Sequence, residues 1–184
     1  MSRSHWFTLL ALVVAVAAIS TSGPLIAYAA ASGLAISFWR NAFSVVVVGP
    51  AAALTRRAEL RRSTRRTLLV CVLAGVSLAV HFGTWVPSVK LTAVATATAL
   101  TATQPVWQGL IALGQGRRLP GLVWVGIVLA VGGAALASGF DLVAEPRAFA
   151  GDLLALAGGV AAAVYTAFGE RARTELSTTG YTAI

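Results

Sequence analysis

An arginine and an asparagine lie together inside a long apolar segment of this chain, at Arg40 and Asn41 within residues 34–54. A charged side chain in hydrocarbon costs about 2.5 kcal/mol or more, so such residues usually face a polar interior or mark a functional site. The alternative is that the long stem of Arg40 carries its guanidinium outward to the lipid headgroups. We predict that Arg40 and Asn41 line the path of a polar solute.

The apolar segment 67–88 contains a histidine, His81, with Ser77 four residues before it. Residues four apart share one face of a helix, and a polar face in a bilayer is expected to point toward the interior of a helix bundle. The alternative is that His81 bonds a neighbouring helix and only holds the bundle together. The acidic residues lie in loops or at segment ends, so His81 is predicted to be the group within the spans that titrates near neutral pH. Proton-coupled transport would use it, while exchange or uncoupled transport is equally compatible.

Further polar residues occupy the segment 92–113, where Thr101, Gln104 and Gln108 share a helix face. Pro105 has no backbone donor for the Thr101 carbonyl, which suits a helix that lines a wet cavity. Packing of small residues against a neighbouring helix is the alternative. The sequence therefore predicts a second polar face on the path.

Two other candidates lie elsewhere. Tyr165 is deep in the segment 150–169, and Asp152 stands near the start of that segment, where we interpret its carboxylate as a helix cap. Pro24 is predicted to kink the first segment near its end. Pro24 and Pro105 are thus the candidate hinges of a gate, although Pro24 could equally mark a plain helix end.

Several functional classes lack support. No HExxH pattern or phosphate-cradling loop occurs, and the single cysteine, Cys71, cannot form a thiolate cluster. The net charge is +8, but the basic residues lie in short bursts between apolar segments rather than on a face interleaved with aromatic residues. We predict no catalysis, no metal, no cofactor and no nucleic-acid partner.

The elements that must position these residues are membrane helices. Of the 184 residues, 58% are hydrophobic and only 11% are charged, whereas a soluble domain has about 25% charged residues. Each apolar segment is long enough to cross roughly 30 Å of hydrocarbon as a helix. The sequence predicts an all-α bundle of about six transmembrane spans in a lipid bilayer, near 6–27, 34–54, 67–88, 92–113, 121–139 and 150–169.

Basic residues alternate between the connecting segments. One set comprises eleven residues, Arg3, Arg56, Arg57, Arg61, Arg62, Arg65, Arg66, Arg117, Arg118, Arg171 and Arg173, and the opposite set has two, Lys90 and Arg147. Because cytoplasmic loops are enriched in arginine and lysine, we predict a multi-pass protein of the bacterial plasma (inner) membrane with a cytoplasmic N-terminus.

The chain also shows a weak internal repeat. Residues 9–18 (LLALVVAVAA) and 153–162 (LLALAGGVAA) match at seven of ten positions. The sixth span would then begin a second copy of a five-span unit, and an odd number of spans inverts that copy in the membrane. Inverted repeats of this kind are common in secondary transporters.

Several motifs, in this order, resemble the EamA-type drug/metabolite transporter superfamily. They are SFWRNA at 37–42, HFGTWVPS at 81–88 continuing to QPVW at 104–107, the glycine-containing segments 114–119 and 126–133, and AGDLLAL at 150–156. The resemblance covers essentially the whole chain. It implies ten helices in two inverted five-helix repeats, with both ends cytoplasmic and a central substrate path.

On this resemblance, residues 1–147 form the first repeat, and residues 148–184 form the sixth span and the start of a seventh. A chain truncated after its sixth helix is therefore expected. The implied function is a secondary carrier that exports small metabolites or drugs, with a non-transporting membrane fragment or scaffold as the alternative and an intramembrane enzyme a weaker one. The sequence indicates neither the substrate nor the oligomeric state.

Overall fold

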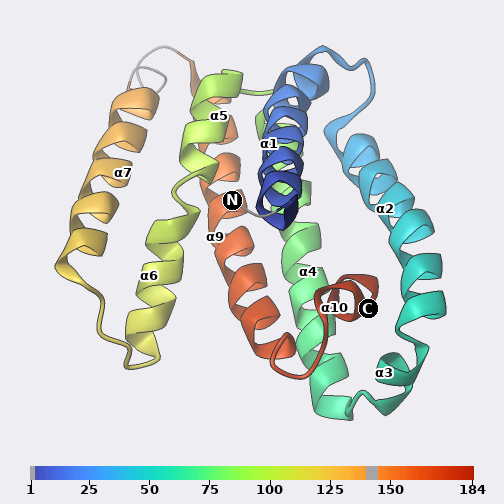
Figure 1. Ribbon diagram of the computed structural model, residues 1–184. Helices are drawn as coiled ribbons and strands as arrows, with labels where there is room; N and C mark the ends of the chain where they lie inside the picture. Colours follow the sequence, from blue (N-terminus) through green and yellow to red (C-terminus); the bar gives the residue numbers. More distant parts are fainter. Residues whose placement is uncertain (1–2, 140–144) are drawn as a thin grey trace.

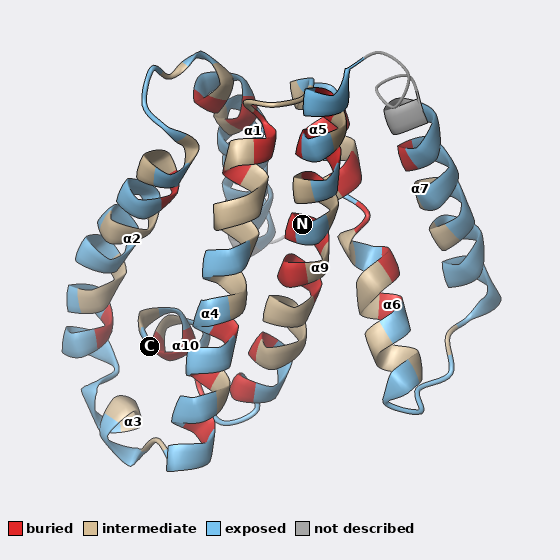
Figure 2. Ribbon diagram, turned by 180° about the vertical axis from the view of Figure 1, so that it is seen from behind, coloured by how far each residue is buried: buried red, intermediate tan, exposed pale blue. Residues whose placement is uncertain are grey.

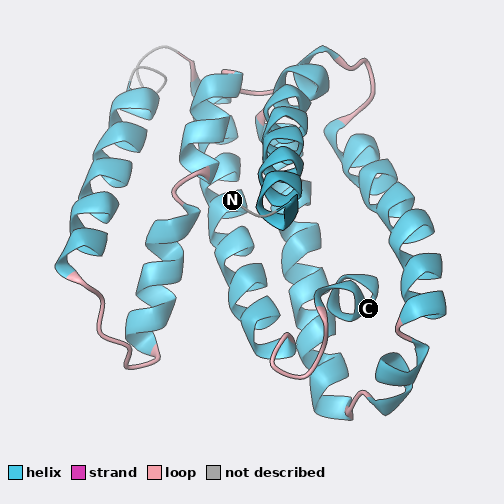
Figure 3. Ribbon diagram, in the orientation of Figure 1, coloured by secondary structure: helices cyan, strands magenta, loops and turns pink. Residues whose placement is uncertain are grey.

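The computed structural model describes residues 3–139 and 145–184, and these residues form helices and connections without a strand (Figure 3). The helices are α1 (Arg3–Tyr28), α2 (Gly33–Thr55), α3 (Arg57–Arg62), α4 (Arg65–Ser88), α5 (Val94–Thr101), α6 (Gln104–Gly114), α7 (Gly121–Gly139), α9 (Pro146–Ala172) and α10 (Thr178–Ala183). This confirms the predicted all-α bundle.

Within the described ranges, four helices are long and apolar enough to cross a membrane, namely α1, α2, α4 and α9. The α5–α6 pair and the apolar α7 occupy the two other predicted spans. Valine, leucine and phenylalanine side chains cover the outer surfaces of α1, α2 and α7. Such a surface suits lipid rather than water, so the chain is a multi-pass membrane protein.

The fourth predicted span is broken, which corrects the expectation of one helix over 92–113. Helix α5 ends at Thr101, a turn follows at Ala102 and Thr103, and α6 begins at Gln104. Pro105 therefore lies in the first turn of α6 instead of kinking a continuous helix. The first helical turn tolerates proline because its N–H groups have no helical partner there.

The most enclosed helix is α9, which lies between α4 on one side and α5 and α6 on the other (Figure 1). Figure 2 shows that buried positions concentrate along it, whereas α2 and α7 are mostly exposed. Glycine and alanine make this possible because small residues let helix backbones approach closely. A Cβ placed on Gly158, for example, would lie 3.1 Å from the Thr84 hydroxyl oxygen of α4.

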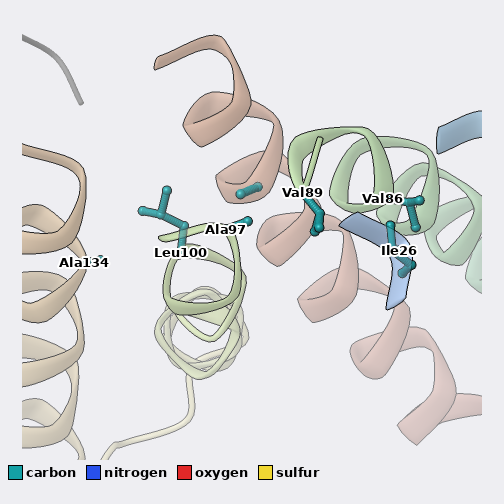
Figure 4. Close-up of a cluster of buried hydrophobic side chains, with 7 residues drawn as sticks. Ile26, Val86, Val89, Ala97, Leu100 and Ala134 are labelled. Atoms are coloured by element: carbon teal, nitrogen blue, oxygen red, sulfur yellow. The ribbon is translucent and has the colours of Figure 1, made fainter. Parts of the chain in front are cut away.

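The main apolar core joins the ends of helices that are far apart in sequence. It contains Ile26 of α1, Val86 of α4 with Val89 after it, Ala97 and Leu100 of α5, Ala134 of α7 and Ala155 of α9 (Figure 4). A second cluster comprises Cys71, Ala74, Ala172, Leu176 and Tyr181, and it lies at the other end of α4 and α9 from the main core. Helices α4 and α9 each contribute residues to both clusters, and so they form the scaffold for the polar residues.

The connections alternate between the two ends of the bundle. The α1–α2 and α4–α5 connections, the last turn of α7 and the first turn of α9 lie at the upper end in Figure 1, and the α2–α4, α6–α7 and α9–α10 connections lie at the lower end. The arginine-rich segments 56–66, 117–118 and 171–173 all belong to the lower end. The predicted charge asymmetry thus corresponds to two real ends, called below the basic end and the opposite end.

Candidate functional site

The guanidinium of Arg40 lies against the aromatic face of α4. Its Cζ atom is 5.0 Å from the centre of the Phe82 ring and 5.7 Å from that of Trp85. Both distances are within the range of a cation–π interaction. Arg40 is seven residues into α2, roughly 10 Å from its first residue. The side chain therefore turns toward α4 at this depth.

His81 joins the same aromatic group and ties α4 to α9. Its ring stacks parallel to Trp85, with centres 6.1 Å apart, and its Nδ1 lies 2.8 Å from the Gly158 carbonyl oxygen. A carbonyl only accepts, so Nδ1 must carry the proton, and Nε2 is the nitrogen that changes its protonation. The predicted helix-holding role is thus present, and it leaves the second nitrogen for other chemistry.

One hydrogen bond joins α2 to α4, and a second one lies within α2. The Ser37 hydroxyl donates to the Phe82 carbonyl at 2.9 Å, and the Asn41 side-chain amide donates to the Ser37 carbonyl at 2.8 Å. Gly33 lets the helices meet, since a Cβ there would lie 2.9 Å from the Pro87 Cα. Residues 33, 37, 40, 41 and 44 consequently present one face of α2 to α4.

A cavity of about 270 Å³ continues from this face toward the basic end. Asn41 and Ser44 of α2, Gly75 of α4, Tyr165 of α9 and Tyr181 of α10 are among its lining residues. The two tyrosine rings stack with centres 6.0 Å apart. Two predicted candidates, Asn41 and Tyr165, therefore line one cavity. Ser77 bonds the Leu73 carbonyl of its own helix and does not line it.

The candidates on α5 and α6 lie on the other side of α9. Thr101 donates to the Ala155 carbonyl at 3.2 Å, and Gln104 donates to the Thr166 hydroxyl at 3.0 Å. Gln108 and Pro105 line a separate cavity of about 250 Å³ near the basic end. The structure thus separates these residues from Arg40 and His81, and Thr101 and Gln104 hydrogen-bond α9.

Pro24 lies in the last part of α1, which continues to Tyr28 without a break. The neighbouring Gly23 is close to Val94 of α5, because a Cβ there would lie 3.1 Å from the Val94 side chain. The hinge function of Pro24 stays a prediction.

The roles of two aromatic residues of the site, Phe82 and Trp85, could not be predicted from the sequence. A tryptophan near a span end, such as Trp85, suits a membrane-interface anchor, and nothing in the sequence indicates a role for Phe82, although both lie within the 81–88 motif.

The prediction that Asp152 caps a helix is wrong. Asp152 is not a cap, because α9 begins six residues earlier and its N-cap position is Glu145. Asp152 is 4% exposed, so an acid does lie inside a span. It borders an apolar cavity of about 480 Å³ between α5–α6, α7 and α9.

Polar contacts join α3 and the first turn of α4 to the α9–α10 connection at the basic end. The Glu59 carboxylate of α3 accepts a 2.6 Å hydrogen bond from the Ser177 backbone N–H, and the Thr67 hydroxyl donates to the Glu175 carboxylate. Charge-assisted hydrogen bonds are among the stronger polar contacts in proteins. We call this pair of contacts the basic-end latch.

Replacing Glu59 with alanine is expected to loosen this latch. The amide of Ser177 should exchange with deuterium about fivefold faster, as expected for losing roughly 1 kcal/mol from a partly exposed charged hydrogen bond. Hydrogen exchange with mass spectrometry measures this. Glu170→Ala is the matched control, because the Arg117–Glu170 pair spans 3.7 Å with both side chains 63% exposed and such pairs contribute little. Equal exchange in wild type and Glu59→Ala would refute the latch.

Apolar helices that run between two ends, with cavities of mixed polar and apolar lining beside a buried central helix, define a multi-pass helical membrane protein. The chain belongs to the EamA-like transporter family, whose family model matches residues 6–139. That range runs from α1 to α7, and the match confirms the resemblance found in the motifs. No curated protein and no solved structure matches the chain. The division into repeats at residue 147 stays a prediction.

Proposed function

We propose that this chain belongs to a secondary carrier that exports small metabolites or drugs across the bacterial plasma membrane without itself catalysing a reaction. The observation that carries the proposal is the 270 Å³ cavity between α2, α4, α9 and α10, close to the Arg40 aromatic group. A carrier needs a polar pocket inside the membrane that can open to either side. Membership of a transporter family supports the same conclusion.

The orientation follows from the arginine-rich connections. If the basic end faces the cytoplasm, the cavity lies nearer the cytoplasm, and Arg40 and His81 lie toward the outer surface. The basic-end latch then lies on the cytoplasmic side of the cavity. An exporter would release this latch to load its solute and pass the solute outward beside Arg40.

Release from loaded liposomes tests this proposal even though the substrate is unidentified. Liposomes containing the purified chain are filled with a bacterial metabolite extract, and mass spectrometry identifies which compounds leave. A carrier should release a limited set of compounds, and adding one of them in excess should slow the release of the others. A release profile identical to that of protein-free liposomes would leave the chain as a non-transporting membrane protein.

His81 is expected to set the pH dependence of this release. With wild-type protein, the rate should change between pH 5 and pH 8, because imidazole is the side chain that ordinarily titrates there. In His81→Gln, which keeps a donor for the Gly158 carbonyl, the rate should vary less than about twofold over that range. Release rates of one identified compound across this range measure the effect.

Asp152→Asn is the control, since Asp152 is the buried acid of α9. It should keep the wild-type pH profile if His81 alone is responsible. A pH profile that survives in His81→Gln but disappears in Asp152→Asn would transfer the role to the acid.

A further inference from the structure

We propose that Arg40 forms an oxyanion-binding subsite and that the solute is a small organic anion with an apolar or aromatic body. The inference rests on the proposed carrier function and adds a substrate class to it. It is based on the positive charge of Arg40 in α2 and on the two rings beside that charge, Phe82 and Trp85.

The charge of Arg40 has no counter-charge among the described residues. Its guanidinium contacts the Phe82 and Trp85 rings, and the ion pair formed within the described ranges, Arg117–Glu170, lies elsewhere. The acids of the basic-end latch, Glu59 and Glu175, already accept hydrogen bonds. A cation at this depth without a counter-charge can still bind an anion, and binding would offset the cost of placing the charge inside the membrane.

The guanidinium also has the right shape for an oxyanion. Its planar fork can donate two parallel hydrogen bonds to a carboxylate or a phosphate group, while the contacts with Phe82 and Trp85 hold the group beside α4. These rings supply no acceptor oxygen for the five N–H donors at the edges of the guanidinium. The side chain itself is exposed, so those edges are accessible.

Neighbouring groups extend the subsite without adding negative charge. Nε2 of His81 becomes a donor when the ring is protonated, and that ring stacks on the same Trp85. The cavity lining combines the hydroxyl-bearing residues Ser44, Tyr165, Tyr181 and Thr182 with apolar residues, and it contains no carboxylate side chain. This composition suits an anion whose remaining surface is apolar.

A lipid headgroup could supply the same oxyanion chemistry. The position of the guanidinium over the α4 rings, rather than extended along α2 toward the opposite end, favours a solute in the bundle. The test therefore needs one arm for small anions and another for anionic lipid.

Quenching of tryptophan fluorescence measures binding, because Trp85 lies beside Arg40. The chain is placed in phosphatidylcholine nanodiscs and titrated with 4-nitrobenzoate, or with 4-nitrobenzamide, which has the same quenching ring without the charge. The variants are Arg40→Gln, Arg40→Lys and the control Arg66→Gln in the first turn of α4, and each is checked for wild-type helicity and melting. A parallel set uses nanodiscs that contain phosphatidylglycerol.

The proposal predicts saturable quenching by 4-nitrobenzoate that is at least about tenfold weaker in Arg40→Gln, as expected for losing charge-assisted hydrogen bonds. Arg40→Lys should retain part of the affinity, Arg66→Gln should match wild type, and 4-nitrobenzamide should quench without saturation. Equal quenching by both compounds, no saturable quenching, or independence from Arg40 would overturn the subsite. Loss of 4-nitrobenzoate binding in phosphatidylglycerol nanodiscs would assign Arg40 to a lipid headgroup instead.

The release assay separates this inference from the proposed function. A chain that selectively releases only neutral or cationic metabolites would remain a carrier and would contradict the anion preference. A chain that binds 4-nitrobenzoate through Arg40 but releases nothing would keep the subsite and contradict transport.

Discussion

Replacing Arg40 with alanine is expected to reduce solute release at least about tenfold while leaving the amount of folded protein in the membrane unchanged. The side chain is exposed and its guanidinium lies over the Phe82 and Trp85 rings, so the fold loses little when it is shortened. The proposed solute path, by contrast, loses the positive charge of the Arg40 guanidinium. Release of one identified compound, normalised to reconstituted protein, gives the ratio.

A matched control is available in the same chain. Arg66 lies at the start of α4 in the basic end and is exposed, so Arg66→Ala removes the same charge away from the cavity. It should release solute at the wild-type rate. Unchanged release in Arg40→Ala at equal protein levels would place Arg40 outside the path and favour the alternative that it extends to the headgroups.

Replacing Gly159 with leucine is expected to cause a large loss of stability. A Cβ at Gly159 would lie 3.2 Å from the Thr101 carbonyl oxygen and 3.3 Å from that of Leu100. Backbone atoms cannot turn aside as a side chain can, so α5 and α9 would have to separate. Overpacking of this kind costs about 1–3 kcal/mol or more, which should lower the Tm in detergent by roughly 4 °C or more.

Gly126→Leu in α7 is the matched control, because nothing lies within 4 Å of a Cβ placed there. The added side chain would reach the outer surface, and leucine favours a helix more than glycine does. The Tm of this variant should equal or exceed that of wild type. Equal Tm values for Gly159→Leu and Gly126→Leu would contradict the central packing of α9.

The sequence is sufficient to predict the spans, because lipid imposes the same requirement on every turn of a membrane helix. It is not sufficient to predict the break at Ala102 and Thr103. Proline at 105 is consistent either with a kinked helix or with the first turn of a new one, and the packing against α9 decides between them. Hydropathy also places the start of α9 four residues too late, which makes Asp152 look like a cap.

The candidate site is predictable only in part, for a related reason. Arg40 and His81 stand out because polar residues are costly in lipid, and the structure places both beside Trp85. The division of the remaining candidates by α9 cannot be seen in the sequence, since glycine and alanine are compatible with contacts on any face. The contact of Trp85 with Arg40 could not be predicted, because an aromatic residue near a span end also suits a membrane-interface anchor.

Labelling from one side of the membrane tests the account most directly, since the position of Arg40 on the path depends on the orientation. In a Cys71→Ala background, Ala31→Cys and Ala58→Cys place single thiols at exposed positions in the α1–α2 connection and in α3. A membrane-impermeant maleimide should label Ala31→Cys in intact cells and Ala58→Cys only after the cells are permeabilised. Labelling of Ala58→Cys in intact cells, with Ala31→Cys protected, would contradict the orientation and the export path derived from it.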